Sequence, residues 1–220
     1  MLKKMLFRIA KSPFMGKVVG RAFQYCPWAI PVKKVYCSKE VLAFHHPSPS
    51  YTNHLILSPR KAIRNLQQLG SEQFVEYFAR IMDAAMDICA KHAAYQEGFV
   101  LVANGGKKQE VQQVHFHMFS NHQMVNGFSE QTAAENVFVS NGVLSMQEHS
   151  EWETHYVLRP AADDAQDKET YLCSALHCIQ ILDEEFDIVN KGYSFLFQYG
   201  GQAAEWDRPV FHVVAGKRRR

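Results

Sequence analysis

Hydrophobic and polar residues alternate along the segment 113–119, which reads Gln-Val-His-Phe-His-Met-Phe. In a β-strand, successive side chains point to opposite faces of the sheet. The pattern therefore predicts a strand over 111–119, with Gln113, His115 and His117 together on one face. The apolar residues between them would pack into a core on the other face.

Similar patterns predict the elements that precede this strand. Over residues 71–95, apolar residues recur every three or four positions, which predicts an amphipathic helix with Ser71 as its N-cap. Runs of β-branched and aromatic residues bounded by Pro, Ser and Asn predict strands. These strands are expected at 32–38, 40–46, 53–59 and 99–103, and a polar loop is expected at 104–110.

The C-terminal part of the chain repeats this order of elements. Residues 137–147 resemble 35–45, 154–160 resemble 53–59, 192–201 resemble 98–106, and 208–216 resemble 113–121, with a second helix predicted over 168–189. Matches in one order and at nearly constant spacing indicate two small domains of the same fold. We expect these domains at 33–125 and 136–217, joined by a polar linker.

The two ends of the chain carry most of its positive charge. Residues 1–39 contain nine Lys or Arg and no acidic residue, and 217–220 add four more, so the remainder is acidic although the formal net charge is +2. Residues 1–32 are predicted to form a basic amphipathic helical segment. Such a segment either lies on an anionic membrane surface or packs on the domain. The asymmetry does not indicate a specific nucleic-acid partner.

Composition and cysteine usage narrow the class of protein. The chain has 220 residues, 47% of them hydrophobic, which is enough for a folded core and excludes a disordered chain. No apolar run approaches the roughly 20 residues of a membrane-spanning helix. Five cysteines without C-x-x-C spacing, and no secretion signal, predict reduced thiols in a cytoplasmic protein. Peripheral membrane association through the N-terminus is the alternative.

The residues around the paired histidines resemble a known family. The segment 113–119 is similar to the pattern His-φ-His-φ-His-φ-φ, in which φ is apolar, of the histidine triad (HIT) superfamily of nucleotide hydrolases and transferases. Residues 43–63, with His54 before an apolar strand, resemble the strand-turn-strand that precedes this pattern. The resemblance implies an α+β fold. Two antiparallel-sheet-plus-helix repeats would form an intramolecular pseudo-dimer with a shared sheet.

The resemblance also implies roles for individual residues. His115, at the central position, would attack phosphorus and form a phosphohistidine-type intermediate, while His117 and His54 would stabilise the charge that develops on the phosphate. It implies neither a cofactor nor a metal. The residues expected to contact a nucleotide or another phosphate ester are Gln113, Asn104, Gln109, His46 and Phe44.

Two positions depart from the family pattern. Gln113 replaces the first histidine, and glutamine can form hydrogen bonds but cannot be protonated. His46 stands where nucleotide-binding members commonly have an aspartate that contacts the ribose hydroxyls. In the second repeat, Val210 corresponds to His115 and cannot act as a nucleophile, whereas His212 corresponds to His117. We therefore expect one active site and one degenerate site.

Several alternatives remain open from the residues alone. His54, His115 and His117 could bind zinc, because imidazole suits that ion. The protein could instead be a nucleotide or phosphate sensor with little catalysis, or a hydrolase of a lipid-linked pyrophosphate at a membrane surface. The glycines at 105–106, followed by two lysines, either cradle phosphate or form an ordinary turn. The chain could be a monomeric pseudo-dimer or a homodimer.

Overall fold

The computed structural model describes residues 32–120, 135–140, 143–147, 152–160, 167–200 and 209–218. The predicted basic helical segment and the predicted linker lie almost wholly outside these ranges. No helix in the described ranges is long and apolar enough to cross a bilayer.

The first half of the chain contains five strands and one long helix. Its elements, in chain order, are β1 (Lys34–Cys37), β2 (Val41–His45), β3 (Leu55–Pro59), α3 (Leu66–Leu69), α4 (Val75–Lys91), η2 (Ala93–Tyr95), β4 (Phe99–Gly105), η3 (Gly106–Lys108) and β5 (Phe116–Ser120). They follow the order predicted from the periodicity of the sequence.

The second half repeats this order. Its described elements are β6 (Glu135–Ser140), β7 (Val143–Gln147), β8 (Trp152–Pro160), α5 (Lys168–Phe186), α6 (Ile188–Lys191), β9 (Tyr193–Tyr199) and β10 (Phe211–Arg218). Each half therefore contributes five strands and one long helix among the described residues.

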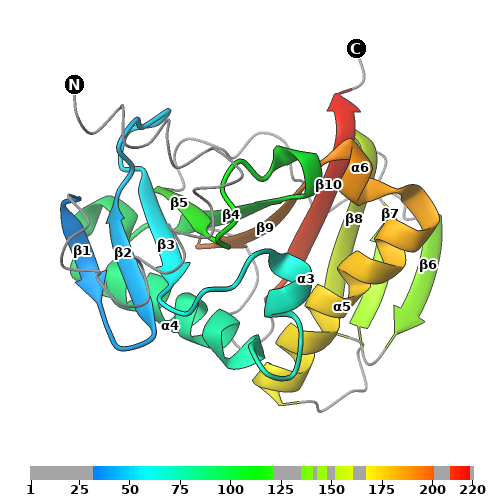
Figure 1. Ribbon diagram of the computed structural model, residues 1–220, viewed down its shortest axis with the longest axis horizontal. Helices are drawn as coiled ribbons and strands as arrows, with labels where there is room; N and C mark the ends of the chain where they lie inside the picture. The colour runs from blue at the N-terminus through cyan, green and yellow to red at the C-terminus, as the bar shows by residue number, and fades with distance from the viewer. Residues whose placement is uncertain are drawn as a thin grey trace.

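All ten described strands form one antiparallel sheet. Their order is β1-β2-β3-β5-β4-β9-β10-β8-β7-β6, so the second half repeats the first in reverse order across the β4–β9 pair (Figure 1). The expected α+β fold, with two sheet-plus-helix halves that share one sheet, is confirmed.

The strand registers repeat as well as the strand order. Ile56 lies opposite His117 in the first half, and Val157 lies opposite His212 in the second. The irregularity in the β1–β2 pair, between Lys34 and Tyr36, has a counterpart in the β6–β7 pair. The resemblance between the segments thus extends to individual hydrogen-bonded positions.

The two halves meet at a pair of equivalent residues. Val102 of β4 and Leu196 of β9 face each other across the central pair. Each of them also pairs with a histidine of its own half. Val102 pairs with His117, and Leu196 pairs with His212, which is the equivalent residue. An approximate two-fold axis therefore passes through the pair Val102–Leu196, and it relates the predicted active site to its counterpart.

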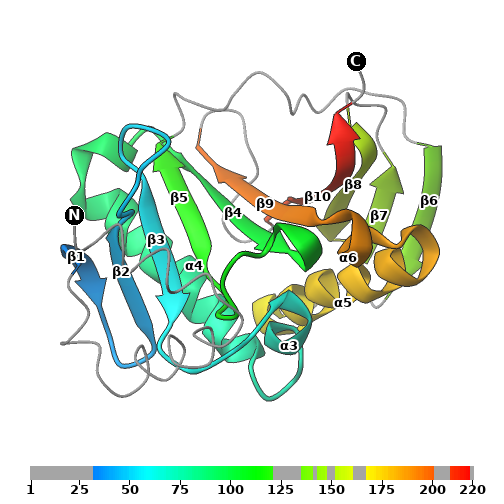
Figure 2. The ribbon, with the colours of Figure 1, turned by 45° about the horizontal axis from the view of Figure 1, so that its top comes forward.

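One continuous core lies between the sheet and the helices. On each strand of the central sheet, alternate residues enter this core together with the apolar faces of α4 and α5, so both helices cover the same face (Figure 2). Phe78 of α4 contacts Phe116 of the first half and Phe195 and Phe211 of the second, at ring-centroid distances of 5.5, 5.9 and 5.8 Å. A single buried ring thus packs against strands of both halves.

Two predicted boundaries are wrong. The long helix begins at Val75 and not beside Ser71, whose hydroxyl donates to the Gln68 carbonyl instead of capping the helix. The predicted strand 111–119 begins only at Phe116. Before that point, the Val114 amide donates to the Ile63 carbonyl, so the backbone that carries Gln113 and His115 is held outside the regular ladder.

The glycine pair after β4 permits close contact between the halves. A Cβ at Gly105 would lie 2.1 Å from Cζ of Tyr193, and one at Gly106 would lie 2.1 Å from the carbonyl oxygen of Val189. Gly106 also has a φ of +57°, a conformation that favours glycine. Packing of the two halves therefore accounts for both glycines without a phosphate ligand, which favours the ordinary turn over the phosphate cradle.

The Gly105 contact generates a stability prediction. Gly105→Ala is expected to lower the free energy of unfolding by about 1–3 kcal/mol, because the buried Tyr193 ring must move to admit a methyl group. Urea denaturation followed by circular dichroism measures this change. In a Tyr193→Leu background the same substitution should cost clearly less. Equal losses in both backgrounds would contradict the proposed cause.

Candidate active site

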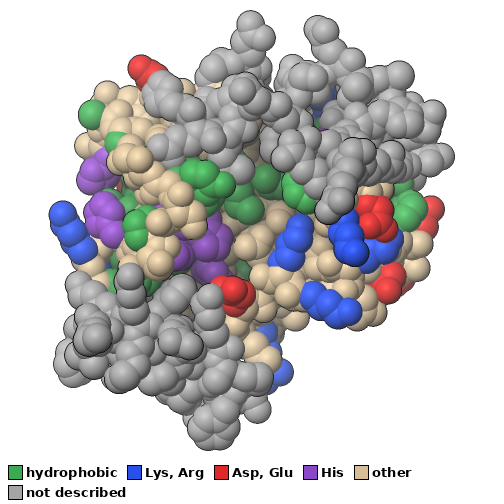
Figure 3. Space-filling view, turned by 90° about the horizontal axis from the view of Figure 1, so that it is seen from above, with side chains coloured by type: hydrophobic (Ala, Val, Ile, Leu, Met, Phe, Trp, Pro, Cys, Tyr) green, Lys and Arg blue, Asp and Glu red, His purple; other side chains and the backbone are tan. Residues whose placement is uncertain are grey.

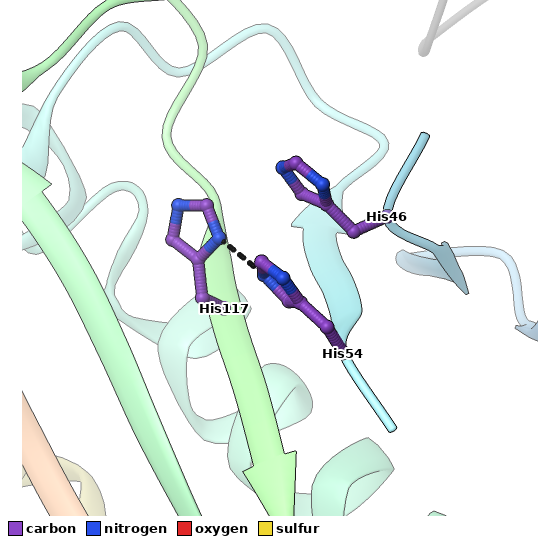
Figure 4. Close-up of side chains that lie close together, drawn as sticks. All are labelled: His46, His54 and His117. Carbon is purple, nitrogen blue, oxygen red and sulfur yellow. Dashed lines mark hydrogen bonds between the residues drawn. The ribbon is translucent and has the colours of Figure 1, made fainter. Parts of the chain in front are cut away.

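Four histidines gather on the face of the sheet opposite the helices. His117 lies on β5, His115 directly precedes that strand, His54 directly precedes β3, and His46 directly follows β2. Strand alternation gives them this common face, since their neighbours Phe116, Leu55 and Leu57 enter the helix-covered core. Histidine side chains are visible together on one side of the molecule in Figure 3, and three of them are drawn in Figure 4.

The orientation of His115 is fixed by a backbone carbonyl. Its Nδ1 lies 2.8 Å from the carbonyl oxygen of Gln113. A carbonyl oxygen only accepts hydrogen bonds, so Nδ1 carries the proton and donates it. In the neutral ring, Nε2 then holds the lone pair. The half-buried His115 therefore has the tautomer that a nucleophile acting through Nε2 requires.

A chain of hydrogen bonds fixes the tautomers of His54 and His117. The Ser50 amide donates to Nδ1 of His54 at 3.4 Å, so the proton of neutral His54 lies on Nε2. That Nε2 is 2.8 Å from Nδ1 of His117, which must accept (Figure 4). The remaining proton of His117 is therefore on Nε2. This N–H is a donor suited to an anionic oxygen.

Burial keeps these imidazoles neutral. Desolvation, with smaller contributions from neighbouring histidines, lowers the pKa of His54 to about 3 and that of His117 to about 2. Desolvation also lowers the pKa of His115, although its hydrogen bond to Gln113 and the charge of Glu110 oppose this shift. The described geometry thus places an uncharged His115, with a lone pair on Nε2, on the same face as an uncharged N–H donor, His117.

Aromatic contacts pack around the histidine pair. The His46 ring stacks on the His54 ring at 4.1 Å with an interplanar angle of 10°, and its Nδ1 accepts from the Ser48 amide. Phe119 contacts His54 at 4.4 Å, and Tyr51 meets Phe119 edge-on at 4.8 Å. The sequence analysis missed Phe119, although strand alternation places it on the same face as His117.

Gln113 holds the segment that carries His115, and its own side chain is buried. Its side chain is only 2% exposed, and Nε2 donates to the carbonyls of Pro59 and Lys61 at 3.0 and 2.9 Å. Both amide protons are therefore used, and Oε1 cannot donate to a phosphate. In place of the expected phosphate contact, the side chain of Gln113 makes hydrogen bonds that hold the chain at the end of β3. We call these hydrogen bonds the clamp. Ser58 strengthens this clamp by donating to the Val114 carbonyl at 2.9 Å.

Gln109 also uses its amide within the protein. Its Nε2 donates to the carbonyls of Arg64 and Val111, so the predicted contact with a ring or a phosphate is replaced by a loop-closing role. Phe44 is 6% exposed and packs with Leu42 and Ile56 on the histidine face. The substrate contact expected of Phe44 stays a prediction.

Asn104 reaches the site from the centre of the sheet. Its Oδ1 accepts a hydrogen bond from the Ser194 hydroxyl of β9 at 2.9 Å, which leaves the amide hydrogens directed away from that contact. Ser194 belongs to the second half of the chain. The sequence analysis missed Ser194, because only the pairing of β4 with β9 brings it opposite Asn104.

The histidine cluster does not have the geometry of a formed metal site. One nitrogen from each of His46, His54 and His117 lies within 4.8 Å of the others. The rings of His46 and His54 are nearly parallel and stacked, so their in-plane lone pairs cannot both point at one ion. His46 would have to rotate to bind zinc. His115, expected in the zinc alternative, is not part of this three-nitrogen group.

The second half retains part of the arrangement. Nε2 of His155 lies 3.0 Å from Nδ1 of His212, which are the same two atoms that join His54 and His117. The two rings are 5.3 Å apart, against 5.1 Å in the first half. Val210 occupies the position of His115. The described geometry therefore repeats the histidine pair but has no counterpart of His115.

Comparisons with known proteins agree with this geometry. The family model described as the HIT domain matches residues 29–124. A 14 kDa zinc-binding protein of Brassica juncea is 31% identical over 113 residues, which cover 50% of this chain and 92% of that protein. A 13.2 kDa HIT-like protein of Azospirillum brasilense is 27% identical over 93 residues, which cover 41% of this chain and 76% of that protein.

Two solved structures resemble nearly the whole chain in fold. A DUF4931 family protein from Bacillus cereus has a TM-score of 0.58 at 9% identity and covers 86% of each chain. A GalT-like protein from Arabidopsis thaliana has a TM-score of 0.51 at 8% identity and covers 88% of this chain and 81% of its own. The family match and the relative at 31% identity show that the chain belongs to the histidine triad (HIT) family.

Proposed function

We propose that the protein is a hydrolase or transferase that cleaves a nucleotidyl or related phosphoryl bond through His115. The observation that carries this proposal is the hydrogen bond from His115 Nδ1 to the Gln113 carbonyl, which leaves the lone pair on Nε2. Membership of the HIT family, together with the fold shared with a GalT-like protein, supports a nucleotide-related hydrolase or transferase at the level of the superfamily.

The proposed reaction has two steps. Nε2 of His115 donates its lone pair to phosphorus, and the bond from phosphorus to the leaving group breaks with its electron pair on that group, which takes a proton from water. Water or another acceptor then attacks phosphorus and gives its proton to the hydroxide that the first step left, while the P–N bond breaks and its electron pair returns to Nε2. With water as the acceptor, one water molecule is added across the original bond. With another acceptor, the reaction is a transfer.

The neighbouring histidines are proposed to stabilise the negative charge that develops on the phosphoryl oxygens. Nε2–H of His117 is held as a donor because Nδ1 is occupied by His54, and such a fixed dipole stabilises negative charge that develops on a phosphoryl oxygen. His46 lies beside this pair on the histidine face. Asn104, held by Ser194, offers its amide hydrogens from the centre of the sheet. These residues are proposed to orient the phosphate ester.

Removal of the nucleophile tests the proposal. His115→Ala is expected to lower kcat/KM by at least about 1,000-fold on any nucleoside phosphoramidate, dinucleoside polyphosphate or nucleotide sugar that the wild-type protein cleaves. His177→Ala, a change at an exposed position of α5, is the matched control. Equal turnover by wild type and His115→Ala would exclude His115 as the nucleophile. Tight binding of the panel without turnover would support the alternative of a sensor.

The covalent intermediate has its own test. Intact-protein mass spectrometry after a brief exposure to substrate and an alkaline quench should show a mass increase equal to the transferred group, because P–N bonds survive base better than acid. His115→Ala should show none, and His177→Ala should match the wild type. An adduct of the same mass on His115→Ala would place the intermediate on another residue.

The lowered pKa values generate a prediction about pH. The active form needs neutral His115, and its pKa is held below the ordinary 6.5 by burial. A lowered pKa moves the loss of the neutral form to lower pH, so kcat/KM should fall to half of its plateau value only at a pH below 6.5. A pH–rate profile at constant ionic strength measures this. An acid limb centred at or above pH 6.5 would contradict the described environment.

A further inference from the structure

One residue in the turn before β3 has an uncommon backbone conformation. Asn53 has a φ of +55°, which residues other than glycine, asparagine and aspartate rarely adopt, and its side chain is exposed. The next residue is His54, whose Nε2 lies 2.8 Å from Nδ1 of His117 (Figure 4). The conformation of Asn53 therefore sets the direction from which the His54 ring enters the site.

A buried tyrosine holds this turn. The hydroxyl of Tyr95, in η2, donates to the carbonyl oxygen of Asn53 at 2.7 Å. That carbonyl belongs to the peptide group that also contains the amide nitrogen of His54. The carbonyl of His54 accepts a hydrogen bond from the His46 amide at 2.9 Å. The backbone of His54 is therefore held on both sides, and on its N-terminal side it is held by the side chain of Tyr95.

Tyr95 is itself fixed from the helix-covered core. It is only 4% exposed, and its backbone carbonyl accepts hydrogen bonds from the Cys89 thiol of α4 at 3.0 Å and from the Gly98 amide at 2.9 Å. Burial raises the pKa of Tyr95, so the phenol keeps its proton and stays a donor at neutral pH. The helix-covered side of the sheet thus supplies a permanent donor to the turn that precedes His54.

The second half has no equivalent of this contact among its described residues. The spacing that relates β4 to β9 makes Val189 equivalent to Tyr95, and valine has no hydroxyl. Thr154, the equivalent of Asn53, lies within β8 and not in a turn. The hydroxyl and the turn therefore occur together, in the half that carries His115.

We propose that Tyr95 is a positioning residue, which orients His54 through the carbonyl of Asn53 and thereby keeps the proton of His117 on Nε2. Its catalytic consequence rests on the proposed function. A displaced His54 would no longer hold Nδ1 of His117 as an acceptor, so the proton of His117 could occupy either nitrogen. The charge that develops on a phosphoryl oxygen would then meet a donor in only part of the molecules. The loss falls on the chemical step and not on substrate binding.

Removal of the hydroxyl tests this role. Tyr95→Phe keeps the ring and should lower kcat by about threefold to tenfold, the effect of one neutral hydrogen bond, with KM within about twofold of the wild-type value. Tyr171→Phe is the matched control, because Tyr171 is similarly buried and donates its hydroxyl to the Pro209 carbonyl at 2.7 Å in the second half. It should lose comparable stability in a thermal melt and keep kcat. Equal kcat for Tyr95→Phe and the wild type would overturn the proposal.

Two further comparisons separate positioning from a general loss of packing. If Tyr95 acts only through His54, Tyr95→Phe should change kcat by less than about twofold in a His54→Ala background. An equal loss in both backgrounds would contradict the proposed path. Asn53→Gly should keep the wild-type kcat, since glycine readily adopts a positive φ, whereas Asn53→Val should lower kcat as Tyr95→Phe does. Wild-type kcat in Asn53→Val would exclude a need for this conformation.

Nitrogen NMR of the imidazole rings tests the positioning without a substrate, and so independently of the proposed function. At neutral pH, wild type and Tyr171→Phe should show the Nε2-protonated tautomer of His54 and of His117. Tyr95→Phe should show a mixture of tautomers at His117. A single tautomer there would overturn the proposal even if the wild-type protein turns over a substrate. A mixture, together with no turnover by the wild type, would contradict the proposed function alone.

Discussion

Strand pairing between β4 and β9 is the contact on which the rest of the structure depends. It joins two five-stranded halves into one sheet and sets Val102 opposite its own equivalent, Leu196. The same pairing brings Ser194 to Asn104, so the second half contributes a hydrogen bond to the site of the first. An isolated half would expose the long edge of its central strand and would lose that contact.

The chemistry of the site rests on backbone groups more than on charged side chains. One carbonyl selects the tautomer of His115, and the Ser50 amide selects that of His54 and, through it, that of His117. Backbone donors and acceptors keep these roles at every pH at which the protein is folded. The clamp formed by Gln113 and Ser58 holds the segment that carries the Gln113 carbonyl against the end of β3, and this fixes the position of His115.

Sequence periodicity predicted the strands, the two long helices and the common face of His115 and His117, because alternation decides which residues are buried together. The resemblance to the HIT superfamily added His54 and His46. Periodicity could not predict the direction of Gln113, since the alternating pattern continues through residues that leave the strand ladder at Val114. It also could not predict the hydrogen bonds from the side-chain amide of Gln109 to the carbonyls of Arg64 and Val111, because these depend on tertiary contacts. The contact of Ser194 with Asn104 depends on the pairing of β4 with β9, which a single segment of sequence does not encode.

The donors of the first site form a series that runs in one direction. Each N–H, from Ser50 through His54 to His117, points toward the next acceptor and finally toward the site. The site therefore presents aligned dipoles, and no net charge, to an anion. Mobile ions screen net charges far more than short-range dipoles. Ionic strength should therefore have little effect on the binding of an anion beside His115.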